Sequence, residues 1–234
     1  MKIIGYTDSK NIVVQFLDNS FITNAQYVQF QKGDIRNPED KTIFNKGYVG
    51  IGDYKTSENK IYIHRYKIWA SMLERCYDPK RQKRQPTYAN CTVCDEWHNY
   101  QNFADWYDEN YYEIPNEVMH LDKDILIKGN KIYSPDNCVF VSMKINSLFV
   151  KRDRDRGKCP IGVYFFKRTN QYISHCNNGN GQAHLGYFNT PEEAFIAYKK
   201  YKEAYIKQVA EEYKKIIPKR LYDAMYKYEV EITD

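Results

Sequence analysis

The sequence predicts an α+β protein with a small N-terminal β module, a central ββα core with flanking helices, and a C-terminal three-stranded sheet plus helix. Strand-like runs bounded by turn residues occur near both ends of the chain, and apolar patterns of helical period lie between and after them. Aromatic residues make up 16% of the 234 residues. A disordered chain is poor in aromatic residues, so this composition indicates a folded protein.

The first predicted part covers residues 1–60. Residues 11–22 have the pattern of two short strands around the polar turn 18–20, which is a hairpin signal. A second polar turn at 31–34 and three glycines further on punctuate the remainder. We therefore predict a small β module, followed by a connecting segment near residues 53–60.

The second predicted part covers residues 61–150 and begins with helices. A helix is predicted over residues 63–76, because apolar side chains recur at helical spacing, namely Tyr66, Trp69, Ala70, Leu73 and Tyr77. Residues 79–86 are a basic stretch between two prolines, which we interpret as a loop. A second amphipathic helix is marked by Trp97, Phe103, Ala104 and Trp106.

A strand–loop–strand–helix pattern follows Pro115. We predict a strand over 118–122, a polar loop over 123–136, a second strand over 137–141, and a helix from about Met143. The charged stretch 151–158 then predicts a linker and a domain boundary.

The third predicted part covers residues 159–234. Three strand-like runs at 162–167, 171–176 and 183–188 precede a helix that begins at Thr190, with Pro191 in its first turn and two acidic residues near its positive end. The tail 214–234 carries Leu221 and Met225 at helical spacing, which favours packing onto the body or onto a partner over catalysis.

Charge and hydropathy limit the class of partner and the compartment. The 35 basic and 30 acidic residues leave a net charge of +5, which permits an anionic partner without requiring one. No apolar run approaches the roughly 20 residues of a bilayer span, and the N-terminal residues lack the pattern of a secretory signal. The six cysteines are spread through the chain, which favours a reduced, cytoplasmic protein.

Two of these cysteines, Cys91 and Cys94, have the spacing of a metal knuckle. A structural zinc ion needs four ligands, and only Cys76, Cys138 or His98 could complete the set. Two buried thiols are the better interpretation, so we do not expect structural Zn²⁺.

The C-terminal part resembles the AP2 (integrase-type) DNA-binding domain over about residues 161–213. The resemblance is carried by G-V-Y at 162–164, Q-Y-I-S at 171–174, L-G-Y-F at 185–188 and T-P-E-E-A-F-I-A-Y at 190–198. Modules of this family read the DNA major groove with the exposed face of the sheet. The resemblance implies that DNA contacts come from this sheet, and the candidate residues are Lys167, Arg168, Tyr172, Ser174 and His175.

The middle of the chain resembles the HNH (ββα-metal) endonuclease core of phage and mobile-element proteins. The run L-D-K-D-I-L-I-K-G-N-K-I-Y-S-P-D-N-C-V-F-V-S-M-K-I-N at 121–146 carries this resemblance. The preceding runs at 69–78 and 93–106 resemble the regions that lead into the core in phage HNH/AP2 proteins. The order of an HNH-like core followed by an AP2-like module is more specific than either motif alone.

The HNH resemblance assigns roles to residues of the core. Asp122 and Asn146 fall at metal-ligand positions for Mg²⁺ or Mn²⁺, and Asp124 could add a ligand. Asn137 corresponds to the asparagine that steadies the loop. Lys123 stands where the family has its histidine base, and His120, two residues before Asp122 on the same strand face, is the candidate replacement.

Two basic stripes lie beside these motifs and are predicted to contact DNA phosphates. The candidate residues are Lys80, Arg81, Lys83 and Arg84 in the first stripe, and Arg152 and Arg154 in the second. The alternative is that both stripes are solvated surface.

Three functional hypotheses follow. The first is a phage-type DNA endonuclease that hydrolyses phosphodiesters with a divalent metal and is targeted by the AP2-like module. The second, favoured by the lysine at the base position, is a non-catalytic scaffold that binds DNA or inhibits a host nucleoprotein defence complex. The third is a transcription regulator that acts through the C-terminal module.

Overall fold

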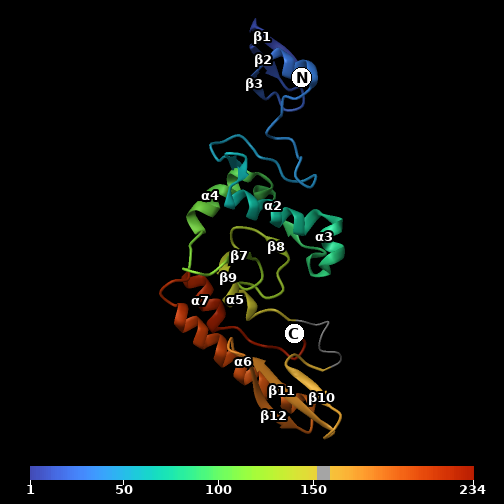
Figure 1. Ribbon diagram of the computed structural model, residues 1–234, viewed down its shortest axis with the longest axis vertical. Coiled ribbons are helices and arrows are strands. Elements are labelled where there is room, and N and C mark those ends of the chain that lie inside the picture. The colour runs from blue at the N-terminus through green and yellow to red at the C-terminus, as the bar shows by residue number, and fades with distance from the viewer. Residues whose placement is uncertain (152–158) are drawn as a thin grey trace. The chain divides into compact units, whose positions relative to one another are not determined.

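The computed structural model describes residues 1–151 and 159–234 and confirms the α+β class (Figure 1). The chain divides into two compact units, residues 1–108 and 109–234. The finer division at 1–60, 61–150 and 159–234 stays a prediction. Among the described residues, no helix has both the length and the apolar character needed to cross a bilayer.

The first unit begins with an antiparallel meander of three strands, β1 (Lys2–Asp8), β2 (Asn11–Gln15) and β3 (Ile22–Ala25), followed by helix α1 (Tyr27–Lys32). The predicted hairpin corresponds to β2 and β3, with Ile12 and Val14 buried. Strand β1 and helix α1 were not predicted from the sequence. Both elements are mainly exposed and therefore lack the apolar periodicity that a pattern search detects.

A helical core follows, built from α2 (His64–Tyr77) and α4 (Tyr100–Asn110), both predicted. Short elements precede them: strands β4 (Ser57–Glu58) and β5 (Ile61–Tyr62) before α2, and the 3-10 helix η2 (Asp95–His98) before α4. Trp69, Trp97 and Phe103 are fully buried, and the indole Nε1 of Trp69 donates a 2.7 Å hydrogen bond to the carbonyl of Trp97. Aromatic packing therefore accounts for much of this core.

The segment before β4 is fastened to α4 rather than being a simple connection. The Gln101 side chain accepts a hydrogen bond from Tyr54 N (3.0 Å) and donates to the carbonyls of Val49 and Tyr54 (3.0 and 3.2 Å). Gly47 lies against α2 so closely that a Cβ atom there would fall 2.4 Å from Leu73 Cδ1. The predicted connection near 53–60 is thus partly a hairpin, β4–β5, next to an anchored segment.

The basic stretch 79–86 was wrongly predicted to be a loop, because residues Pro79–Arg84 form helix α3. Asp78 caps this helix by accepting a hydrogen bond from Lys80 N (3.0 Å), and Pro79 occupies the first turn, where its missing N–H costs nothing. The 3-10 helix η1 (Pro86–Tyr88) and strand β6 (Thr92–Val93) follow α3.

The second unit starts with the predicted strand–loop–strand–helix. Strand β7 (Met119–Asp122) pairs antiparallel with β9 (Val139–Ser142), the short strand β8 (Ile132–Tyr133) lies in the loop between them, and α5 (Met143–Ser147) follows β9. Ser142 caps α5, since its hydroxyl accepts a hydrogen bond from Ile145 N (3.3 Å). The four β9 residues are buried, so this strand is the centre of the ββα core.

The C-terminal sheet is an antiparallel meander of β10 (Val163–Phe166), β11 (Gln171–Asn177) and β12 (Gln182–Phe188). Helix α6 (Pro191–Tyr213) lies along one face of this sheet (Figure 1). Thr190 caps α6 as predicted, because its hydroxyl accepts from Glu193 N (3.2 Å). Ala194, Phe195 and Tyr198 of the helix bury Val163 and Cys176 of the sheet.

The tail packs onto the body of the second unit, as predicted. Helix α7 (Lys219–Tyr226) buries Leu221 and Met225 completely. Arg220 donates to the carbonyls of Pro135 and Cys138 (3.3 and 2.7 Å), which join α7 to the ββα core. Of the stretch 151–158, predicted to be a linker and boundary, residues 152–158 lie outside the described residues, so that boundary stays a prediction.

Candidate functional site

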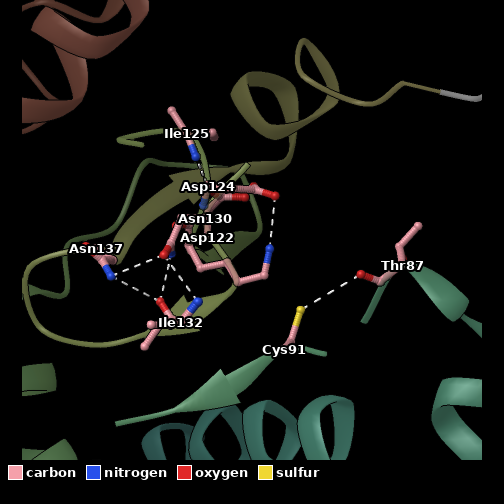
Figure 2. Close-up of polar contacts among 9 residues, drawn as sticks. Thr87, Cys91, Asp122, Asp124, Ile125, Asn130, Ile132 and Asn137 are labelled. Atoms are coloured by element: carbon pink, nitrogen blue, oxygen red, sulfur yellow. Dashed lines mark hydrogen bonds and ion pairs between the residues drawn. The ribbon is translucent and has the colours of Figure 1, made fainter. Parts of the chain in front are cut away.

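Asp122 ends strand β7, and its carboxylate organises the start of the following loop. Its Oδ1 atom accepts hydrogen bonds from the backbone N–H groups of Asp124 and Ile125, both at 2.8 Å (Figure 2). Burial, together with the nearby charge of Asp124, raises the pKa of Asp122 to about 6, because these two effects outweigh the two N–H donors and Lys123, which lower it. The site therefore holds a carboxyl group that titrates near neutral pH.

Lys123, at the position where the HNH family has its base, is a buried cation with a carboxylate partner. The residue is 6% exposed, and its Nζ atom lies 2.9 Å from Asp124 Oδ2. The same ammonium lies 5.9 Å from the ring centroid of Tyr133 on β8. Because a carboxylate partner favours the charged amine, this arrangement suits Lys123 to holding an anion better than to accepting a proton.

Two asparagine side chains close the loop between β7 and β9. Asn130 Nδ2 donates to the carbonyls of Lys123 (2.6 Å) and Ile132 (2.8 Å), and Asn137 Nδ2 donates to Asn130 Oδ1 (3.3 Å) and to the Ile132 carbonyl (3.4 Å) (Figure 2). Asn137 thus contacts the loop through Asn130 and Ile132, and the role that the resemblance gives it stays a prediction. Asn130 was not predicted to be a site residue, although a Gly-Asn pair in the sequence is typical of a turn. Gly129 does adopt a left-handed turn conformation, with φ +80°.

The remaining candidates lie on the two elements that flank Asp122. His120 is on β7, opposite Val141 of β9, and its spacing of two from Asp122 places both on the same side of the strand. Asn146 is on α5 and is partly buried. The candidates thus come from the first strand of the ββα core and from the helix that follows its second strand.

The carboxylates of Asp122 and Asp124 are not arranged to bind a magnesium or manganese ion together. One oxygen of Asp122 accepts two backbone N–H groups, and Asp124 is paired with the Lys123 ammonium, which competes with a cation for that carboxylate. Within residues 1–151 and 159–234, no three His, Cys, Asp or Glu side chains form a group that could hold a metal ion. We therefore derive no chemical step through a metal.

Cys91 and Cys94 are free thiols in the first unit. Cys91 is buried, and its Sγ atom lies 3.8 Å from the carbonyl of Thr87, to which it donates (Figure 2). Cys94 is partly buried, and burial raises the pKa of its thiol. A raised pKa disfavours the thiolate form that binds zinc.

In the first basic stripe, residues 80–84, three of the four basic side chains are exposed to solvent. Lys80, Lys83 and Arg84 are exposed, and their spacing of three and four places them on one face of α3, which we call the α3 cation face. Arg81 is partly buried. Burial, rather than position around the helix, therefore distinguishes Arg81 from the other three predicted contacts, since Arg81 also lies three residues before Arg84. Arg152 and Arg154 of the second stripe lie outside the described residues.

On the C-terminal sheet, strand alternation decides which candidates face outward. Tyr172 packs against the core beneath α6, and Ser174 is 0% exposed, so these two predicted DNA contacts were placed on the wrong face. His175 lies on the opposite, outer face. Lys167 and Arg168 are exposed in the turn between β10 and β11 rather than on a strand.

The outer sheet face also carries aromatic residues that the sequence analysis did not select. Tyr164 is 41% and Tyr187 is 52% exposed, and the rings of Tyr164 and His175 lie 5.3 Å apart. His184 lies between His175 and Tyr187, with 5.0 Å between neighbouring ring centroids. Simple alternation along β12 could not have identified both His184 and Tyr187, because the register shift beside His175 brings residues three positions apart to the same face.

The chain matches no protein-family model, no curated protein and no solved structure. Inferences about function therefore depend on the residues and contacts described above.

Proposed function

We propose that this protein binds DNA, with the α3 cation face and the outer face of the β10–β12 sheet as its contact surfaces. The observation that carries the proposal is the α3 cation face, where Lys80, Lys83 and Arg84 project from one side of a capped helix. Basic residues on such a face neutralise phosphates and release counterions, which gives affinity without sequence preference.

The outer sheet face supports the same function by a different kind of contact. Tyr164 and Tyr187 offer exposed rings, and Lys167 and Arg168 stand in the turn at one end of the sheet. Arginine can read guanine through a bidentate contact, whereas exposed rings can stack on bases or pack against sugars. This combination of groups assigns base contacts to the second unit.

We further propose that the ββα core binds the phosphodiester backbone without cleaving it. The specific support is the pairing of Lys123 with Asp124, which places an ammonium where a nuclease of this type needs a base and which occupies one of the two carboxylates. A buried ammonium held by an ordered loop is a preorganised anion ligand.

Phosphodiester hydrolysis is the second candidate function, and a different observation favours it. The pKa of Asp122 is raised to about 6, chiefly by burial, and His120 shares its strand side, so a carboxyl group with a raised pKa and an imidazole lie close together in sequence. Groups with such pKa values are suited to general acid–base catalysis at physiological pH.

One experiment separates the two candidates. The full chain is incubated with supercoiled plasmid in the presence of Mg²⁺, Mn²⁺ or a chelator, and binding of a labelled duplex is followed by fluorescence anisotropy in parallel. We expect binding in every condition and no nicking. Nicking that disappears in Asp122→Ala, but persists when the exposed carboxylate of Asp136 is removed, would support the second candidate instead. Absence of binding to any duplex would refute the proposal.

A further inference from the structure

Two histidines lie side by side on neighbouring strands of the C-terminal sheet, on the outer face that the proposed function assigns to DNA contact. His175 on β11 and His184 on β12 occupy opposite positions in the antiparallel register, next to an irregularity between Ser174 and His175. The Nε2 atom of His175 lies 2.9 Å from the Nδ1 atom of His184. Their rings are inclined at 74° with centroids 5.0 Å apart. Two imidazole nitrogens are therefore held within hydrogen-bond distance on an exposed sheet surface.

The surroundings of this histidine pair are aromatic and polar. The Tyr164 ring lies 5.3 Å from His175, and the Tyr187 ring lies 5.0 Å from His184, both in edge-on geometry. The Gln182 side chain hydrogen-bonds to His175 and belongs to the same outer face, two residues before His184. The pair thus has two ring neighbours that restrict its rotation and one amide that can supply an oxygen ligand.

We propose that His175 and His184 form a binding site for a divalent transition-metal ion, with the two imidazole nitrogens as ligands. Two metal–nitrogen bonds of about 2.0–2.1 Å that meet at a right angle separate their nitrogens by about 2.9 Å. This is the separation found between Nε2 and Nδ1. A tetrahedral angle would require about 3.4 Å. The spacing therefore favours square-planar or octahedral coordination, as Ni²⁺ and Cu²⁺ adopt, over a tetrahedral zinc site.

The nitrogen donors also favour a transition-metal ion. Imidazole nitrogens suit nickel, copper and zinc, whereas magnesium and calcium require oxygen ligands. In the metal-free pair, one of the two nitrogens donates a hydrogen bond to the other. For both to bind the ion, the donating ring would carry its proton on its other nitrogen, and water or Gln182 would complete the shell.

The test is a titration of the metal-free full chain with Ni²⁺, followed by NMR of histidine-labelled protein without nucleic acid. Ni²⁺ is paramagnetic and broadens resonances close to it. We expect one equivalent to broaden the imidazole signals of His175 and His184 before any others. His184→Gln and His175→Gln should each weaken this binding at least about tenfold, because one nitrogen ligand is lost. The matched control is His64→Gln, which alters a histidine that contacts Tyr107 in the other unit (2.9 Å).

Several results would overturn the proposal. They are unbroadened signals at one equivalent, broadening that begins at another histidine, or equal affinity in the control and in both variants. Thermal unfolding shows whether each variant is folded. Because His184 is more exposed than His175, its replacement should leave the fold intact even where replacement of His175 does not. Because the assay contains no DNA, its failure would leave the proposed function unaffected.

Discussion

Replacing Asp122 with asparagine should make the protein more stable at neutral pH. Burial raises the pKa of Asp122 from its ordinary value of 3.8 to about 6, so the folded state holds the proton more tightly than the unfolded state. The penalty for ionising the carboxyl is therefore complete above about pH 6 and disappears below its ordinary pKa. At 1.36 kcal/mol for each pH unit between the two values, the ionised carboxylate costs about 3 kcal/mol.

Asparagine keeps the useful part of this side chain. Its Oδ1 atom can accept the same two hydrogen bonds from Asp124 N and Ile125 N, each 2.8 Å long in the parent protein, without carrying a charge. We expect Asp122→Asn to raise the free energy of opening of the ββα core by up to about 3 kcal/mol at pH 7.5. The gain should shrink as the pH falls and vanish near pH 4.

Native-state hydrogen exchange of the β9 amides measures this free energy locally at pH 7.5 and 4.5. Asp124→Asn is the matched control: it removes the ion pair with Lys123 and one of the charges that raise the pKa of Asp122, but it leaves the buried carboxyl in place, so it should reproduce at most a small part of the gain at pH 7.5. An Asp122→Asn protein that is less stable at pH 7.5, or whose stability change is the same at both pH values, would refute the reasoning. Either result would also show that the pKa of Asp122 is not raised toward neutral pH.

Three further outcomes are expected. Simultaneous replacement of Lys80, Lys83 and Arg84 by alanine should weaken duplex binding and reduce the slope of log affinity against log salt by about 3, measured by fluorescence anisotropy; an unchanged slope would contradict the phosphate contacts. Asp234→Asn should cost about 1–3 kcal/mol in urea unfolding at pH 7, because its carboxylate accepts from two lysines at 2.8 Å. Although burial raises the pKa of Asp234, hydrogen bonds and the lysines lower it overall, so its contribution should disappear as the pH falls below 3.8; a pH-independent effect would count against this account. Gly47→Ala should destabilise the first unit by about 1–3 kcal/mol, followed by tryptophan fluorescence, because the new methyl group would lie 2.4 Å from the leucine side chain of α2; a neutral effect would show that this leucine moves aside freely.

Elements with strong apolar periodicity could be predicted from the sequence. The strands around Phe140 and the helices around Trp69 and Tyr198 bury one face or both, and that burial leaves a pattern in the residue order. Helix α3 has no such pattern, because none of its residues is buried. Its existence depends on the Asp78 cap and on Pro79, which are equally common in turns.

The site residues divide in a similar way. The sequence indicated Asn137 as a loop residue of interest through a motif that links residue type to position, and its side chain does contact the loop at Asn130. The orientation of Tyr172 and Ser174 could not be anticipated, since alternation predicts two faces but not which face α6 covers. The ion pair of Lys123 with Asp124 depends on the tight turn after β7, and neighbouring residues in a strand would point to opposite sides.

The contacts of Asp234 determine when the second unit can complete its fold. This residue bonds to Lys128, 106 positions earlier, and to Lys151, 83 positions earlier. Contacts between residues so far apart in sequence form late in folding, because the chain between them must first lose conformational entropy. On a translating ribosome, the ββα core must therefore wait for residue 234 before it gains these ion pairs. The core and the C-terminal sheet, joined through this tail, should consequently unfold in one cooperative transition rather than separately.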